Sequence, residues 1–284
     1  MAGNWILAFL FLASIAKAEV FYVTSLRYRG NSKGDITQAV ANAWRDACAS
    51  PWPAKVIIPK WEYYLRGANL KGPCKAPIEI QVQGYLRAPQ DRSRLIQQGT
   101  WNLMFDFVTN SIIKGITSLD SKYFYINAHE CRNVTLQYLT ITAPEDSHST
   151  DGIHIGSSFG ITINHTTIIG TGDDCVSVIG GSKNIIATNF ICGPGHGISI
   201  GSLGKYPNEE PVTGVAVKNC TLKYTQNGVR IKRWPGSPTF RPRQSGTHCK
   251  QDDPSKVKIS EIGFTNIKGS SATPVAVKLL CSRK

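Results

Sequence analysis

Two adjacent aspartates, Asp173 and Asp174, stand at the entrance of a short β-branched run, and Cys175 follows them directly. Carboxylates this close raise each other's pKa values, so one can hold its proton while its neighbour stays ionised. A protonated and an ionised carboxyl group together form the acid and base pair that glycoside hydrolysis requires. The pair therefore indicates acid–base chemistry, and the rest of the sequence must supply the groups that support it.

The segment that carries this pair is one of four related segments, which superpose without gaps. Their second residues stand 23, 22 and 31 positions apart. A repeat of roughly 20 to 50 residues is typical of solenoids, in which each repeat buries its apolar side against the next. The segments are "TDGIHIGSS" from Thr150, "DDCVSVIGG" from Asp173, "GHGISIGSL" from Gly195 and "QNGVRIKRW" from Gln226.

Between these segments lie short β-branched runs separated by Gly, Asn, Asp and Ser, such as "KVIIP", "NVTLQYLTI" and "GITINHTTII". A strand–turn–strand unit of this length without a helix predicts an all-β parallel β-helix. A β-sandwich is the alternative, but it does not require a constant period. Equivalent runs are expected to begin at Val134, Ile161, Ile185 and Val215, with Ile112 before them.

One short helix is expected as a cap at the N-terminal end. The stretch "GDITQAVANAWRDAC" opens with Asp35, which we expect to be the N-cap. Four apolar residues then recur on a single helical face. They are Ile36, Val40, Ala43 and Trp44.

Equivalent positions of successive turns in such a solenoid lie one inter-strand spacing apart, about 4.8 Å. The second residues of the four segments form what we name the stacked column: Asp151, Asp174, His196 and Asn227. Asp173 would lie beside this column. Aspartates in turns are also typical of Asx-turns, caps and calcium sites. Those explanations would suffice for one aspartate, whereas three carboxylates and an imidazole favour an acid–base site.

A basic pair follows in the last of the four segments. Arg230 and Lys232 fall three and five positions after Asn227, so the alternation of a strand points both toward one face. Their neighbours Val229 and Ile231 are expected to point to the core. The pair can bind an acidic group, although two ordinary solvated cations are the alternative.

The net charge of +13 points to the kind of partner. The excess is concentrated between Arg230 and Lys284, which favours a polyanion. For a secreted chain, acidic polysaccharide is the expected partner rather than nucleic acid. A basic surface that serves solubility is the alternative.

The first 18 residues have the features of a signal peptide, with an apolar run from Trp5 to Ile15 before Ala16-Lys17-Ala18. The rest, residues 19–284, is expected to be a single soluble domain, and no later segment is long and apolar enough to span a membrane. In an oxidising compartment the eight cysteines are expected to form disulfides rather than bind metal. Glycosylation sequons begin at Asn133, Asn164 and Asn219.

Four motifs, "TDGIHI", "GDDCVSV", "GHGISIGSLG" and "NGVRIK", resemble in this order the signatures of the polygalacturonases, family 28 of the glycoside hydrolases. The resemblance is strongest to the secreted plant enzymes and runs from about Asn133 to Trp234. It implies a right-handed parallel β-helix that hydrolyses the α-1,4-galacturonosyl linkages of demethylesterified pectin with inversion, without metal or other cofactor. We expect a secreted monomer that acts in the cell wall.

The resemblance also implies roles for the stacked residues. Asp173 would be the general acid, while Asp151 and Asp174 would hold and deprotonate the attacking water. His196 would tune the acid.

Substrate binding and one disulfide are implied in the same way. Arg230 and Lys232 would bind a galacturonate carboxylate, for which a guanidinium fork and an ammonium group are suited. Cys175 and Cys192 would form a disulfide that clamps the turns of the site.

The sequence departs from the family after the Arg-Ile-Lys motif, where a coil and a substrate-contacting tyrosine are missing. The last tyrosine is Tyr224. The C-terminal coils are therefore expected to be incomplete, in a shortened member. Two alternatives follow: a catalytically silent galacturonan-binding homologue, and a calcium-dependent pectate lyase on the same architecture.

Overall fold

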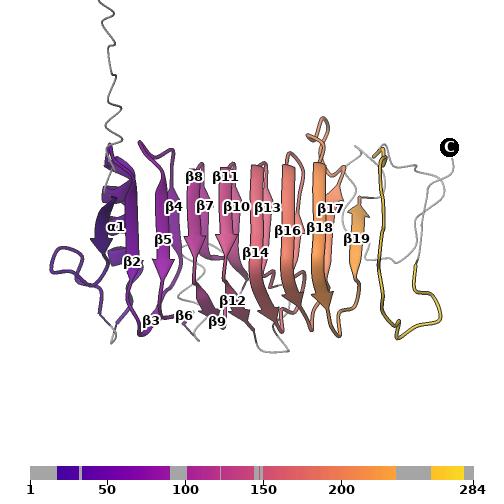
Figure 1. The fold of residues 1–284 in the computed structure, drawn as a ribbon, viewed down its shortest axis with the longest axis horizontal. Coiled ribbons are helices and arrows are strands. Elements are labelled where there is room, and N and C mark those ends of the chain that lie inside the picture. Colours follow the sequence, from indigo (N-terminus) through magenta and orange to yellow (C-terminus); the bar gives the residue numbers. More distant parts are fainter. Residues whose placement is uncertain are drawn as a thin grey trace, which may run out of the picture.

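The computed structural model describes residues 18–31, 34–89, 101–121, 123–143, 147, 150–234 and 257–277. The expected signal peptide lies almost entirely outside these residues, and so does the stretch 235–256 that follows the Arg-Ile-Lys motif. Figure 1 shows an elongated stack of strands that run side by side along the molecule. The prediction of an all-β solenoid with one N-terminal helix is confirmed for the described residues.

Two parallel sheets extend along the stack. The 7-stranded sheet consists of β4 (Ala68–Lys71), β7 (Trp101–Asp106), β10 (Phe124–His129), β13 (Ile153–Gly156), β15 (Val176–Val178), β17 (Ile198–Leu203) and β19 (Val229–Arg233) in that order. The 12-stranded sheet contains β1 (Glu19–Tyr22), β2 (Ala54–Ile58), β3 (Glu62–Tyr64), β5 (Ile78–Val82), β6 (Tyr85–Arg87), β8 (Thr109–Lys114), β9 (Thr117–Leu119), β11 (Arg132–Gln137), β12 (Thr140–Thr142), β14 (Phe159–Ile169), β16 (Lys183–Cys192) and β18 (Thr213–Leu222).

The register of the 7-stranded sheet confirms the stacked column. Ile153 of β13 pairs with Val176 of β15, which pairs with Ile198 of β17. Ile198 pairs in turn with Val229 of β19. Each of these residues stands two positions after a member of the column. The spacings of 23, 22 and 31 residues are therefore single turns of the solenoid.

The larger sheet confirms four of the five expected run starts and corrects the fifth. Val134 pairs with Ser111 rather than with Ile112. Ile112 is 38% exposed, whereas Ile113 is fully buried. Two consecutive isoleucines leave the phase of the strand alternation undecided in the sequence, and a shift of one residue exchanges the inner and outer faces. The confirmed starts are Val134, Ile161, Ile185 and Val215.

Each later turn of the larger sheet bends at a residue with a left-handed backbone. Counted from the first inward residue n of each run, such as Ile185 or Val215, the inward residues stand at n, n+2, n+5 and n+7, and the bend lies at n+4. The bend residues Asn189 and Asn219 have φ of 51° and 50°. Asparagine adopts this conformation more readily than most residues. The segment 257–264 repeats the pattern outside both sheets, with φ of 56° at Glu261 and apolar residues Val257, Ile259, Ile262 and Phe264.

The helix α1 (Thr37–Ala49) packs against β4 at the N-terminal end of the solenoid. The expected apolar face is buried, with Ile36, Val40, Ala43 and Trp44 at most 2% exposed. The expected N-cap is wrong by one residue, because Ile36 takes that position. Asp35 forms a bridge with Tyr64 and an ion pair with Arg66, which fix it before the helix. It still accepts a hydrogen bond from the backbone N–H of Thr37 at 2.8 Å.

The opposite end of the 7-stranded sheet corrects one expectation about the core. Val229 is 37% exposed and Ile231 is half-buried. Both alternate with Arg230 and Lys232 as expected, but β19 is the last described strand of its sheet, so no described turn covers their apolar side.

Cysteine pairing follows the expectation only in part. Among the described cysteines, disulfides join Cys48 to Cys74 and Cys175 to Cys192. Cys131 and Cys220 are free. Burial raises the pKa of the Cys131 thiol to about 11, so this residue packs as a small apolar side chain. The other two of the eight cysteines lie outside the described residues.

Candidate active site

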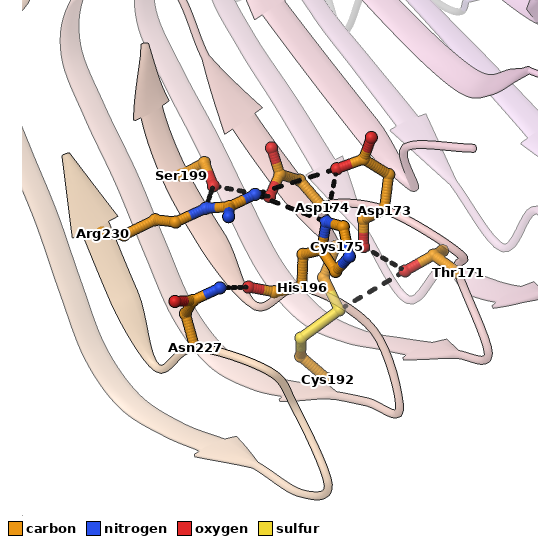
Figure 2. The surroundings of a disulfide bond; sticks show 9 residues. All are labelled: Thr171, Asp173, Asp174, Cys175, Cys192, His196, Ser199, Asn227 and Arg230. Carbon is orange, nitrogen blue, oxygen red and sulfur yellow. Dashed lines mark hydrogen bonds and ion pairs between the residues drawn. A yellow bond between two sulfur atoms is a disulfide. The ribbon is translucent and has the colours of Figure 1, made fainter. Parts of the chain in front are cut away.

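Asp173 and His196 form the accessible part of the predicted site. They lie in the turns that lead into β15 and β17, and His196 Nδ1 is 2.9 Å from Asp173 Oδ1. The Asp173 and His196 side chains are 32% and 34% exposed. Figure 2 shows the imidazole beside the carboxyl group, close to the Cys175–Cys192 disulfide. A substrate can therefore reach Asp173, whose carboxyl group is oriented by the imidazole.

Asp174 is the buried centre of the site, with a side chain only 2% exposed. Its Oδ1 accepts hydrogen bonds from Ser199 Oγ at 2.5 Å and from an Nη atom of Arg230 at 2.8 Å. Its Oδ2 accepts one from Lys232 Nζ at 2.8 Å. Both carboxylate oxygens are thus occupied by donors, and two of the three donors carry positive charge.

Burial and the neighbouring donors shift the pKa of Asp174 in opposite directions, and the donors have the larger effect. Burial alone would raise the pKa, because a buried carboxylate loses its hydration. The hydrogen bonds from Lys232 and Ser199, together with the charges of Lys232 and Arg230, outweigh burial and hold the pKa below its ordinary value. Asp174 is therefore ionised at neutral pH.

Arg230 connects the buried and the accessible carboxyl groups. Its Nε donates to Ser199 Oγ at 2.7 Å, which places the guanidinium plane against β17. An Nη atom lies 3.8 Å from Asp173 Oδ1 and 3.4 Å from His196 Nδ1. One guanidinium group thus contacts both aspartates and the histidine.

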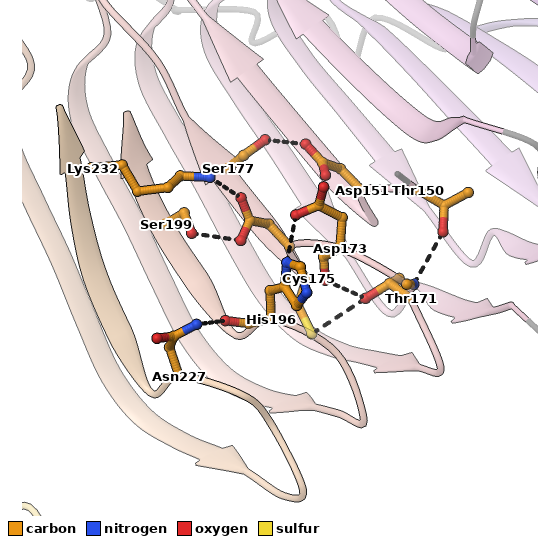
Figure 3. Close-up of polar contacts among 12 residues, drawn as sticks. Thr150, Asp151, Thr171, Asp173, Cys175, Ser177, His196, Ser199, Asn227 and Lys232 are labelled. Atoms are coloured by element: carbon orange, nitrogen blue, oxygen red, sulfur yellow. Dashed lines mark hydrogen bonds and ion pairs between the residues drawn. The ribbon is translucent and has the colours of Figure 1, made fainter. Parts of the chain in front are cut away.

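Asp151 lies one turn away in a different environment. Its Oδ2 accepts a hydrogen bond from Ser177 Oγ at 2.6 Å and lies 3.3 Å from His154 Nδ1. His154 in turn contacts Ser177 at 2.6 Å and stacks on Phe124 with ring centroids 4.5 Å apart. Among the described residues no Lys or Arg pairs with Asp151, unlike Asp174. Figure 3 shows Asp151 and Asp173 on neighbouring turns, with Lys232 approaching from the other side.

Covalent and hydrogen bonds fix the turns that carry these residues. The Cys175–Cys192 disulfide joins the residue after Asp174 to the strand before His196. Thr171 Oγ1 donates to the backbone carbonyl of Asp173 at 3.2 Å. The fourth member of the stacked column, Asn227, donates to the His196 carbonyl at 3.4 Å. These contacts restrict the turns on both sides of the aspartates.

Side-chain contacts connect five of the six predicted catalytic and substrate-binding residues around Asp174, and the sixth, Asp151, lies one turn away, held by Ser177 and His154. Sequence reasoning missed Ser177, Ser199 and His154, which hold the aspartates. The repeat alignment contained the signal, because all three stand three positions after a column residue, as Arg230 does.

A metal site is the chemical alternative for this cluster. Asp173, Asp174 and His196 offer ligand atoms within 4.8 Å of one another. Arg230 and Lys232, however, already neutralise Asp174 and place two positive charges where a cation would bind. The residues therefore suit an anionic sugar better than a metal ion.

The three sequons lie on the larger sheet. Asn133 and Asn219 are exposed, and Asn164 is half-buried. Asn133 Nδ2 donates to Asn110 and Asn164 Oδ1 accepts from Asn189, each at 3.1 Å.

No described helix is long and apolar enough to cross a membrane.

The arrangement can separate the roles of acid and base. A half-exposed carboxyl group, Asp173, stands beside a carboxylate that two cations keep ionised. The two carboxyl groups therefore differ in solvent access and in charged partners, as the acid and base groups of glycoside hydrolases do. The site can therefore donate a proton to a leaving oxygen and accept one from water.

Comparisons with known proteins agree with this chemistry. The profile of Glycosyl hydrolases family 28 matches residues 94–240, which include every residue of the cluster. A polygalacturonase of Gossypium barbadense is 41% identical, covering 98% of this chain and 84% of the relative. An exopolygalacturonase of Oenothera organensis is 42% identical, covering 88% of this chain and 86% of the relative. The first alignment has 343 positions, so the relative holds residues that this 284-residue chain lacks.

Solved structures agree with the fold. An endo-xylogalacturonan hydrolase from Aspergillus tubingensis superposes with a TM-score of 0.60 at 21% identity, covering 77% of this chain and 69% of that one. A polygalacturonase from Erwinia carotovora superposes with a TM-score of 0.53 at 19% identity, covering 72% and 70%. At these identities the likeness establishes the fold alone.

Proposed function

The chain belongs to family 28 of the glycosyl hydrolases, and we propose that it hydrolyses the α-1,4-galacturonosyl linkages of demethylesterified pectin by an inverting acid–base mechanism. The observation that carries the proposal is the contrast between Asp173 and Asp174. One carboxyl group is open to substrate beside an imidazole, and its neighbour is buried and neutralised by Arg230 and Lys232.

In this mechanism Asp173 donates its proton to the glycosidic oxygen as the bond from that oxygen to the anomeric carbon breaks. A water molecule adds to the anomeric carbon from the opposite face, and its proton passes to a carboxylate. Asp174 is a weak base, because its pKa is held low and both its oxygens accept hydrogen bonds. Asp151 has no cationic partner among the described residues, so it is the better proton acceptor, and Asp174 positions the water.

His196 and Arg230 support the acid. The imidazole contact at 2.9 Å orients the Asp173 carboxyl group, and the guanidinium group lies 3.8 Å from the same oxygen. As Asp173 releases its proton, both groups stabilise the negative charge that forms.

Substrate selection rests on Arg230 and Lys232, whose side chains are 26% and 29% exposed beside the acid. A guanidinium group has five N–H donors and an ammonium group has three, so both can bind a sugar carboxylate in addition to Asp174. A methyl ester offers only neutral acceptors. The proposed substrate is therefore the unesterified polymer.

Replacing Lys232 with methionine should weaken binding of polygalacturonate about tenfold more than binding of its methyl ester, equivalent to about 1.4 kcal/mol. The ratio of the two affinities is the measurement, because loss of Lys232 also raises the pKa of Asp174 and affects turnover of both substrates. Lys218→Met, at an exposed position on β18, is the control for charge. Equal weakening for both polymers would contradict the assigned role.

The proposal includes secretion to the cell wall. Two disulfides among the described residues are typical of an oxidising compartment, and the N-terminal signal-like segment agrees with export. The basic net charge suits attraction to an acidic polysaccharide.

A catalytically silent homologue that binds galacturonan is the second candidate. Two observations favour it: the cotton relative holds positions that this chain lacks, and Arg230 and Lys232 retain their contacts with Asp174. Binding of polygalacturonate without release of reducing ends would identify it.

A further inference from the structure

A second cluster lies near the N-terminal end of the 7-stranded sheet. Lys71 ends β4, and its Nζ is 5.8 Å from the ring centroid of Phe107. The same ring meets the imidazole of His129 edge to face, with centroids 6.2 Å apart. Asp106 contacts that imidazole at 2.9 Å. We name Lys71, Phe107 and His129 the distal cluster.

The distal cluster faces outward and is accessible. Lys71 and His129 directly follow Leu70 and Ala128, which are fully buried, so strand alternation turns both away from the core. Lys71 is exposed, Phe107 is 36% exposed, and the His129 side chain is 40% exposed. Lys71 forms no ion pair with a described residue. The cluster can therefore accept a ligand without first losing an internal salt bridge.

Phe107 holds an unusual backbone conformation for its type, with φ of 56°. A bulky residue in the left-handed region is uncommon and costs free energy. Nothing in the apolar core requires the ring at this position, since it is exposed. An aromatic ring presented to solvent in this way is suited to stacking on the less polar face of a sugar.

The cluster borders a basic hollow on one side and Asp106, whose side chain is 12% exposed, on the other. A hollow of about 360 Å³ opens between α1 and β4 beside Lys71, and its lining includes Arg45 and Lys75. The lining contains three cations and no carboxylate. An anionic ligand would therefore be attracted to this end of the sheet.

The register relates the distal cluster to the proposed active site. Lys71 of β4 pairs in register with Asp106 of β7, Asp106 with His129 of β10, and His129 with Gly156 of β13, the strand next to β15 in the sheet. In the strand order, β4 is separated from β15 by four inter-strand steps, or about 19 Å. A single sugar cannot bridge that distance, whereas a polysaccharide laid along the sheet can.

On the basis of the proposed function, we propose that the distal cluster binds a uronate unit of the same polysaccharide chain, several sugars away from the bond that is cleaved. Lys71 pairs with the carboxylate, Phe107 stacks on the sugar ring, and His129 offers a hydrogen bond to a hydroxyl group. The cluster makes affinity depend on chain length, because only a long chain reaches both regions.

Calorimetric binding to an Asp173→Asn parent, which does not consume its ligand, tests this proposal. The ligands are polygalacturonate and digalacturonate, which is too short to reach from one region to the other. Adding Lys71→Met should weaken polygalacturonate binding about fivefold more than digalacturonate binding, as expected for one partly exposed ion pair. Phe107→Gly keeps the left-handed backbone available and should cause a similar selective loss.

The control is Lys218→Met in the same parent, which removes an exposed lysine from the other sheet. High salt should abolish the effect of Lys71→Met and preserve that of Phe107→Gly, since screening acts on charge alone. If the selective loss of polygalacturonate binding is no larger than in the control, the distal cluster does not bind the polysaccharide, and the proposed function remains intact. A parent that binds neither ligand would overturn the proposed function itself.

Discussion

Replacing Asp173 with asparagine is expected to lower kcat on polygalacturonate by about 10²- to 10⁴-fold, the range that a general acid contributes. Asparagine still accepts a hydrogen bond through Oδ1, so the contact with His196 can persist while the transferable proton is lost. The measurement is the rate of reducing-end release by variant and wild type at saturating substrate.

Asp120→Asn is the matched control, because Asp120 is an ion-paired aspartate next to the larger sheet, bound to Arg87. It should retain wild-type turnover. A variant at Asp173 with more than about one tenth of the wild-type kcat would contradict its role as the acid.

Replacing Asp174 with asparagine is expected to destabilise the fold by about 2 to 3 kcal/mol. Removing one partner of a buried ion pair leaves the other charge uncompensated, which costs about 3 to 5 kcal/mol when burial is complete. Here the carboxylate is buried, but Arg230 and Lys232 keep 26% and 29% exposure, so water recovers part of the loss. Urea denaturation of both proteins at neutral pH measures the difference.

The stability difference should also depend on pH with a defined sign. The pKa of Asp174 is lowered in the folded protein. Its contribution to stability is therefore complete above the ordinary aspartate pKa of about 3.9 and is lost as pH falls through the folded-state value. The gap between wild type and Asp174→Asn should be constant from neutral pH down to about pH 4 and shrink below it. A gap that does not change in acid would show that the charge of Asp174 is not its source.

The proximity of the site residues could be predicted from the sequence, because residues one repeat apart lie next to each other on neighbouring turns of a solenoid. Asp151, Asp174 and His196 follow from the superposition of four short segments, and the strand register agrees. The position of Arg230 and Lys232 on one face followed from strand alternation alone. The spacing could not show which side chains contact one another, since Lys232 binds Asp174, which lies two strands away.

Other features were beyond the sequence for identifiable reasons. The supporting serines, Ser177 and Ser199, take the position of Arg230 in the repeat alignment, but a short side chain common on any strand does not show which group it contacts, so their contacts of 2.6 and 2.5 Å with aspartates come from the geometry. Ile112 was misplaced because adjacent isoleucines fit either phase. Free Cys131 shows that a cysteine count does not fix pairing when burial alone accounts for a thiol.

Proton NMR of the first product released from polygalacturonate tests the central claim most directly, because it reports the reaction and its stereochemistry together. An inverting attack on the α-linkage predicts new reducing ends that appear first as the β-anomer and only later equilibrate. First appearance of the α-anomer would contradict inversion, and unsaturated ends that require calcium would identify a lyase. Binding without any new ends would contradict the assignment of Asp173, Asp151 and Asp174 to catalysis.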